Sequence, residues 1–243
     1  VEYVAEVAEQ VFLREDWAEQ ERPLGIFITG GTILGKLAGK EEDDFYLQYV
    51  EAIRERIGHR WPILIQSGAK DKETCKRYRA AGVDIHGANI EVWDKKLFEI
   101  ICPGKSQYIG REEWIKRVVE SVDVFGEGNV APNFVLGVEM CQPYGFKDMR
   151  DALKSTKEGL EFLMSHGVTP RWESWNISPY SVLAGNVPPP LEFYIRADLA
   201  WLETWVKHDL PPIGLKGVKG PGRARISISC IHDMDPSAGK WVR

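Results

Sequence analysis

The chain has 243 residues, of which 44% are hydrophobic and 28% are charged, and its formal net charge at pH 7 is -5. This composition indicates one globular domain with a substantial core, excludes a disordered chain, and argues against a nucleic-acid partner. No apolar run approaches the roughly 20 residues that span a bilayer, and the acidic start of the chain is not a secretory signal.

The cysteines and the start of the chain bear on where the protein works. The cysteines are dispersed, form no CxxC pair and predict no disulfide framework, which is typical of the reducing cytoplasm. They are Cys75, Cys102, Cys141 and Cys230. Val1 is not an initiator methionine and stands directly before a helical pattern. We therefore expect a cytoplasmic protein and a chain that is a fragment of a longer one.

Amphipathic patterns alternate with short apolar runs along the chain. In residues 1–18, apolar side chains recur at helical spacing with glutamates on the other side, which predicts a helix. The same reasoning predicts further helices at residues 45–57, 70–81, 110–125, 146–166 and 191–207. The first of these would be capped by Asp43 or Asp44. The apolar runs predict strands at residues 25–29, 61–66, 83–93, 130–138 and 168–175.

The alternation of five strands with helices predicts an α/β fold made of right-handed βαβ units. An open doubly wound sheet and part of a β/α barrel both fit. Every strand ends in polar or glycine-containing sequence, which favours a partial barrel over residues 1–210, with parallel strands in chain order. Residues 211–243 are predicted to be a separate tail that covers the barrel. It would consist of a glycine-rich lid or linker at 216–225 and a strand near 226–230.

The first apolar run ends in Gly30-Gly31-Thr32, a turn where the backbone can bend sharply and a ligand can come close. An ordinary tight turn explains a single Gly-Gly pair as well. The case for a ligand site is that polar residues follow the other strands in the same way. These residues are Ser67, His86, Asn89, Glu91, Glu139 and Asn176. In parallel α/β proteins such strand ends share one edge, where ligands bind.

The ordered set of strand ends resembles the radical S-adenosylmethionine (radical SAM) superfamily, particularly its branch similar to biotin synthase and lipoyl synthase. Residues 28–32 resemble the family's glycine-rich motif, and residues 87–92 resemble the polar motif of its fourth strand. Residues 135–139 resemble the fifth-strand motif, of which only Gly137 and Glu139 match. Residues 175–190 resemble the sixth-strand region and its proline-rich exit. The resemblance covers about residues 1–205.

This resemblance implies a partial TIM-like barrel without its first strand, which binds SAM for 5′-deoxyadenosyl radical chemistry. The turn after the first apolar run would hold the methionine amine, and Asn89 and Glu91 would contact that amine or the ribose hydroxyls. Arg111, preferred to Lys105 for its bidentate guanidinium, would meet the SAM carboxylate. The implied cofactor-binding residues are Gly30, Gly31, Thr32, Ser67, Asn89, Glu91, Arg111, Gly137, Glu139 and Asn176.

The family's CxxxCxxC motif, which holds a [4Fe-4S] cluster, is absent from this chain. We expect the cluster to come from residues upstream of Val1, in an N-terminal segment or a partner chain. A barrel that has lost its cluster is the alternative. The resemblance also implies a small-molecule substrate or cofactor precursor, in a reaction of cofactor biosynthesis or sulfur insertion.

Several of these residues also have plain structural explanations. Glu91 can pair with a neighbouring cation, Asn89 can be a turn residue, and Arg111 can be a solvated residue at a helix start. Glu139 can cap a turn. Cys230 lies near a histidine and two aspartates, but one thiol cannot build a cluster.

Two functions of other classes stay open on the sequence. A non-redox β/α-barrel lyase or aldolase would use Asp84 and Glu91 as acid and base. A non-catalytic subunit would use an association face around Trp201 and Trp205, which are at helical spacing.

Overall fold

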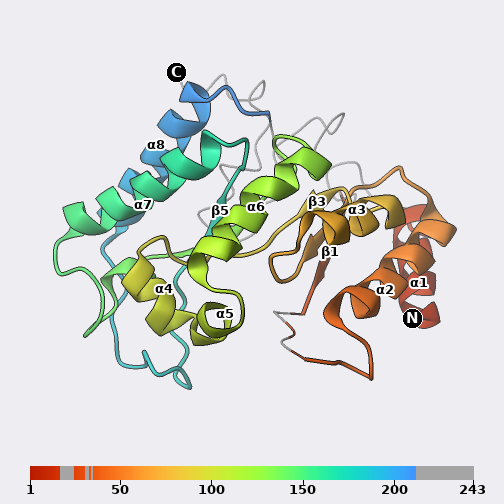
Figure 1. Cartoon of the computed structure of the whole chain (residues 1–243), viewed down its shortest axis with the longest axis horizontal. Coiled ribbons are helices and arrows are strands. Elements are labelled where there is room, and N and C mark those ends of the chain that lie inside the picture. The colour runs from red at the N-terminus through yellow and green to blue at the C-terminus, as the bar shows by residue number, and fades with distance from the viewer. Residues whose placement is uncertain (17–24, 31–32, 34, 212–243) are drawn as a thin grey trace.

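The computed structural model describes residues 1–16, 25–30, 33 and 35–211 (Figure 1). Gly31 and Thr32 lie outside the described residues, and so does the tail from residue 212 onward. The predictions made for the tail therefore stay predictions. They are the lid at 216–225, the strand near 226–230 and the role of Cys230.

In the described part of the chain, five short strands run parallel to one another. β1 pairs with β2 and β2 with β3, while β4 pairs with β5 in a second ladder. The strands are β1 (Ile26–Thr29), β2 (Ile63–Gln66), β3 (Ile85–His86), β4 (Asn133–Leu136) and β5 (Arg171–Ser174). Parallel bridges from His86 to Val130 and from Glu91 to Phe134 join the two ladders. The predicted chain order and parallel direction of the strands are thus confirmed.

The helices lie close to where the amphipathic patterns predict them. They are α1 (Glu2–Glu9), α2 (Glu42–Ile57), α3 (Lys72–Ala81), α4 (Lys95–Ile101), α5 (Pro103–Tyr108), α6 (Arg111–Phe125), α7 (Met149–Met164) and α8 (Leu191–Lys207). A π-helical turn, η1 (Gln10–Arg14), follows α1, and a 3-10 turn, η3 (Val138–Met140), follows β4. Aspartates cap three starts: Asp71 at α3, Asp94 at α4 and Asp148 at α7 each accept a backbone N–H.

Several predicted boundaries were wrong for identifiable reasons. Helix α2 starts at Glu42, so Asp43 and Asp44 lie in its first turn rather than at its cap. The third strand is much shorter than 83–93, because the backbone leaves regular pairing after His86. Helices α4 and α5 were not predicted, since each is too short to show a clear period.

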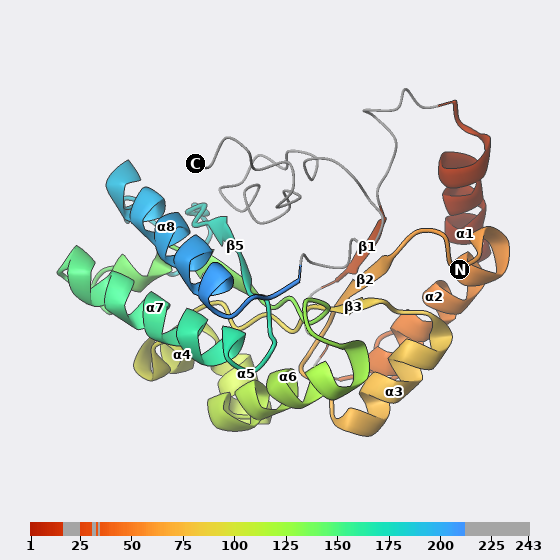
Figure 2. The same ribbon diagram turned by 90° about the horizontal axis from the view of Figure 1, so that it is seen from above.

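The helices cover one side of the strands. Figure 2 shows α2, α3, α6, α7 and α8 following one another around the outside of the strands. The helix pairs in contact include α1–α2, α2–α3, α3–α6 and α7–α8. The core between helices and strands is continuous and includes the fully buried rings of Trp114, Phe134 and Trp172. None of the helices in the described part is both long and apolar enough to cross a membrane.

Candidate functional site

A cavity of about 490 Å³ lies beside the carboxyl ends of the central strands. Its walls come from the backbone after β3, from β4 and η3, from the region after β5, and from the junction of α4 and α5. The lining residues are Glu91, Ile101, Cys102, Pro103, Gly104, Lys105, Val135, Val138, Trp175, Ser181 and Leu183. The cavity is therefore mostly apolar, with one carboxylate and one ammonium group, as small-molecule sites usually are.

Glu91 is the carboxylate of this cavity and has an unusual backbone. Its φ is 67°, in the left-handed region that residues other than glycine seldom adopt. Its Oε1 accepts a 2.5 Å hydrogen bond from the Nζ of Lys105, which also donates to the Asn89 carbonyl oxygen at 2.9 Å. The Lys105 ammonium lies 4.9 Å from the centre of the Trp114 ring. A strained residue held by several contacts is typical of functional sites.

Polar side chains connect the ends of β1, β2 and β3. The Thr29 hydroxyl donates to Gln66 Oε1 at 2.8 Å, and Gln66 Nε2 donates to Asn89 Oδ1 at 2.6 Å. Asn89 Oδ1 also accepts the backbone N–H of Asn133 on β4 at 3.1 Å. We call Thr29, Gln66 and Asn89 the polar relay. It links the ends of β1 and β2 to Asn89, two residues before Glu91.

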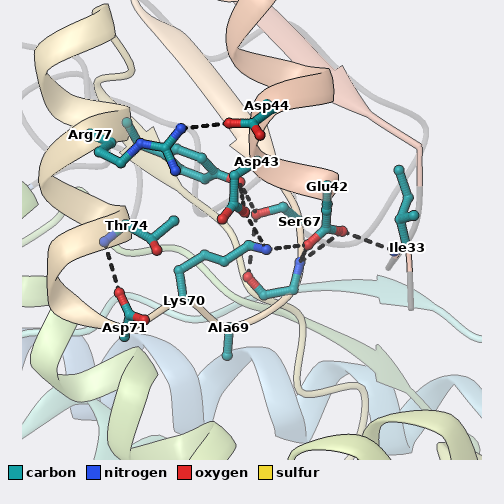
Figure 3. A network of polar contacts seen from close by, with 12 residues as sticks. Ile33, Glu42, Asp43, Asp44, Ser67, Ala69, Lys70, Asp71, Thr74 and Arg77 are labelled. Carbon is teal, nitrogen blue, oxygen red and sulfur yellow. Dashed lines mark hydrogen bonds and ion pairs between the residues drawn. The ribbon is translucent and has the colours of Figure 1, made fainter. Parts of the chain in front are cut away.

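Ser67 belongs to a second network, next to the start of α2 (Figure 3). Lys70 Nζ lies 2.5 Å from both Glu42 Oε2 and Asp43 Oδ1, and the three side chains are largely buried. Glu42 also accepts the backbone N–H groups of Ile33 and Gly68. Ser67 is within 3.5 Å of the buried Tyr78 hydroxyl, so it faces this network and not the cavity.

His86 is fully buried behind this network, 3.4 Å from the Ser67 hydroxyl. Burial lowers the pKa of His86 to about 4, so the ring is neutral. It packs between the rings of Tyr78 and Phe125 and serves the core rather than the cavity.

Arg111 does not line the cavity. Its guanidinium donates to the carbonyl oxygen of Trp93 and stacks over the Trp93 ring, 4.6 Å from its centre. The cation that lies beside Glu91 is Lys105, which the sequence had ranked second. The short helix α5 carries Lys105, whose ammonium reaches back to Glu91 and to the Asn89 carbonyl oxygen.

Gly137 and Glu139 form a buried turn next to the cavity. Glu139 accepts the backbone N–H of Gly137 at 2.7 Å and lies 3.0 Å from the Thr156 hydroxyl. Gly137 has a φ of 106°, and a Cβ there would lie 2.8 Å from the Tyr194 hydroxyl. Both residues hold η3 against α7 and α8, and neither lines the cavity.

Gly30 and Asn176 lie at the predicted strand ends but not on the cavity wall. A Cβ on Gly30 would collide with the Tyr46 hydroxyl, so any other residue there would force that side chain to move. Asn176 is exposed. The residues that the sequence reasoning missed are Thr29, Gln66, Cys102 and Trp175. Thr29 and Gln66 could have been predicted, because each is the polar residue that ends one of the first two strands.

The described residues do not fit an iron–sulfur cluster. Cys75, Cys102 and Cys141 are all buried and separate, and no group of three potential metal ligands occurs in the described part. Burial raises the pKa of Cys75 and of Cys102 to about 12, which opposes the thiolate form that iron requires. These cysteines are core residues.

The chain is similar to known proteins in sequence and in fold, although no protein-family model matches it. Over 138 residues it is 27% identical to bacteriochlorophyllide c C-7(1)-hydroxylase of Chlorobaculum limnaeum, a stretch that is 57% of this chain and 32% of that relative. The fold is similar to the crystal structure of HydG, a maturase of the [FeFe]-hydrogenase, with a TM-score of 0.54 at 11% identity.

The chain spans about a third of the length of the curated relative, and the likeness to HydG covers 85% of this chain and 42% of HydG. Both proteins are radical SAM enzymes, the superfamily that the sequence motifs resemble. Neither comparison supports the biotin synthase branch that the sequence motifs suggested. The chain is a mixed α/β protein with parallel strands, similar in sequence and fold to radical SAM enzymes.

Proposed function

We propose that this chain is the SAM-binding part of a radical SAM enzyme, with the Glu91–Lys105 pair at the site. The observation that supports this proposal most directly is the position of Glu91. Its carboxylate lies on the wall of an apolar cavity, on a backbone with positive φ, and pairs with the Lys105 ammonium. The methionine part of SAM has one ammonium and one carboxylate. A carboxylate and an ammonium side by side can each take the opposite charge of such a group.

The rest of the cavity suits the other part of the molecule. Trp175, Val135 and Leu183 present apolar surface, on which an adenine ring can pack. SAM bound there would supply the 5′-deoxyadenosyl group for radical chemistry. This chain's residues would orient it and keep water away from it.

The proposal extends to the barrel, the cluster and the compartment. A partial β/α barrel is supported by the parallel strands in chain order and by the helices on their outside. A [4Fe-4S] cluster would have to come from residues other than the described ones, in the same polypeptide or in a partner chain. We further propose a cytoplasmic enzyme.

For the substrate we propose a cofactor precursor. The hydroxylase relative acts on bacteriochlorophyllide c, as its name says, and supports this class. The residues after β5 add a physical argument: Ser181 and Leu183 face the cavity while Tyr180 and Val182 are almost fully exposed. Exposed apolar side chains next to a cavity mouth suit a substrate with a large apolar surface.

SAM binding to the full-length, cluster-reconstituted protein, measured by calorimetry, tests the proposal. We expect Glu91→Gln to weaken SAM binding about 10- to 150-fold, because a hydrogen bond to a charged group contributes roughly 1.5–3 kcal/mol. Lys105→Met should weaken it similarly.

Glu99→Gln is the matched control, because Glu99 is exposed on α4 and does not line the cavity. It should bind SAM as the wild type does. Equal affinity of the wild type and Glu91→Gln would remove Glu91 from the site, and a wild type that does not bind SAM would overturn the proposed function.

A further inference from the structure

The backbone around Glu91 forms a bulge in the pairing with β4. The N–H groups of Ile90 and Glu91 both donate to the carbonyl oxygen of Asn133, at 3.1 and 3.0 Å. The Glu91 carbonyl then accepts the N–H of Val135 at 2.8 Å. Two residues of one strand opposite a single residue of its neighbour define a β-bulge, which changes the direction of a side chain. Here it coincides with the positive φ of Glu91 and with its place on the cavity wall.

A side chain fills the hydrogen bond that the bulge leaves open. The N–H of Asn133 donates to Asn89 Oδ1 at 3.1 Å instead of to a backbone carbonyl of the neighbouring strand. A buried backbone N–H must find an acceptor, because leaving it unpaired costs about 1–3 kcal/mol. The Asn89 amide therefore stabilises the bulge only when its oxygen, and not its nitrogen, faces Asn133.

This requirement sets the direction of every hydrogen bond in the polar relay. A backbone N–H is always a donor, so the atom of Asn89 that meets it must be the oxygen. Gln66 approaches that same oxygen at 2.6 Å and must present its NH2 group. Gln66 Oε1 then points to Thr29, whose hydroxyl donates to it at 2.8 Å.

We propose that Gln66 is a positioning residue, which fixes the orientation of the Asn89 amide and so holds the bulge that places Glu91 beside Lys105. Only the step from this bulge to SAM binding rests on the proposed function.

Gln66→Glu tests this directly, because glutamate keeps the shape of glutamine but reverses the polarity. An ionised carboxylate in place of the Gln66 amide would put two acceptors 2.6 Å apart, whereas a protonated carboxyl can donate to Asn89 as glutamine does. Two other charged groups lie near the relay. Lys105 donates to the Asn89 carbonyl oxygen and to Glu91, and the variant keeps both of these charged residues.

The readout is the melting temperature of the full-length protein at pH 5 and pH 8. Because the folded state favours the protonated carboxyl, the variant should lose stability as pH rises from about 4.5 toward 8. We expect it to melt about 3 °C or more below wild type at pH 8 and to recover most of that difference at pH 5. The wild type serves as the reference at each pH.

Two further variants keep the result unambiguous. Gln66→Met removes the relay without adding a titrating group, so its loss of stability should be the same at both pH values. Gln48→Glu, the same exchange in a half-buried glutamine of α2 away from the relay, should not show the recovery at pH 5. A Gln66→Glu deficit that does not depend on pH would overturn the proposal.

SAM affinity separates this inference from the proposed function. At pH 8 Gln66→Glu should bind SAM about tenfold more weakly than wild type, a deficit that should shrink at lower pH. If the wild type does not bind SAM but the melting temperature of Gln66→Glu still depends on pH, the role of the relay is supported and the proposed function is wrong. If Gln66→Glu binds SAM as wild type does at pH 8, Gln66 does not position the site.

Discussion

At the scale of single residues, two glutamates at strand ends have opposite environments. Glu91 is partly exposed on the cavity wall and paired with Lys105. Glu139 is completely buried, and burial raises its pKa to about 7. The Thr156 hydroxyl lies within reach of both Glu139 and the Ala152 carbonyl, and its single proton cannot serve both. A protonated Glu139 can donate to Thr156 and satisfy all three groups.

Glu139 should make the stability of the protein depend on pH. A pKa of about 7 in the folded state lies above the unfolded value, so the folded state holds the proton more tightly. The stabilisation from this group is then fully present below about pH 4.5 and is lost as pH rises through about 7. Relative to Glu139→Gln, the wild type should lose roughly 2–3 kcal/mol of unfolding free energy between pH 4.5 and 8, measured by urea denaturation.

The control for this measurement is Glu158→Gln on the exposed side of α7. It should follow the wild type at every pH. Parallel curves for the wild type and Glu139→Gln would show that Glu139 is ionised in the folded protein over this range.

At the scale of elements, the first turn of α2 carries acidic side chains into the interior beside β2 and α3 (Figure 3). Glu42 is 5% exposed, and Lys70 neutralises it together with Asp43. Burial alone would lower the pKa of Lys70, but the two carboxylates outweigh it and raise the pKa, so the ammonium stays charged. Glu42 also binds the backbone after β1 and after β2. One ion pair therefore fixes two loops at the carboxyl edge.

Removing the cation of this network should be costly. Lys70→Met leaves Glu42 as an uncompensated buried charge, and we expect the unfolding free energy to fall by about 3–5 kcal/mol. Lys72→Met is the matched comparison. Lys72 pairs with Asp123 at the surface, so its loss should lower the unfolding free energy far less than the loss of Lys70 does.

Chemical denaturation at neutral pH measures both variants. Adding Glu42→Gln to Lys70→Met should restore part of the loss, because it removes the unpaired charge. Similar losses for Lys70→Met and Lys72→Met would contradict the role of the buried pair.

At the scale of the whole molecule, the two ladders depend on the irregular segment between β3 and β4. The N–H groups of Ala131 and Val135 donate to the carbonyls of His86 and Glu91 across this junction. The core on the helix side is also continuous from one ladder to the other. The ladders should consequently unfold as one cooperative unit.

Hydrogen exchange measured by NMR tests this cooperativity. The amides of Ala131 and Val135 should be protected to within about tenfold of those of Asp84 and Gly87, which bond to β2. The mutually bonded Leu37 and Lys40 amides in an exposed turn should exchange much faster. Exchange at Ala131 and Val135 that is orders of magnitude faster than at Asp84 would mean that the second ladder opens independently.

Much of the fold could be predicted because it depends on short-range pattern. Apolar runs ending in polar residues located the five strands, and helix α8 has its predicted bounds. Chain order then predicted spatial order, since parallel βαβ units place successive strands side by side. The irregular pairing after β3 could not be predicted. It depends on hydrogen bonds that Asn89 accepts from Gln66 and from the Asn133 backbone, which are distant in the sequence.

The sequence by itself determined the alternation of strands and helices and the edge at which polar residues gather, because both follow from local periodicity and from strand polarity. Only the tertiary structure decided which of those residues share a cavity. Glu91 meets Lys105 there, while Arg111 turns to the Trp93 carbonyl and Glu139 is buried under α7. The physical reason is that the cavity wall is set by α5 and a bulge, and their contacts join parts of the chain that no local pattern relates.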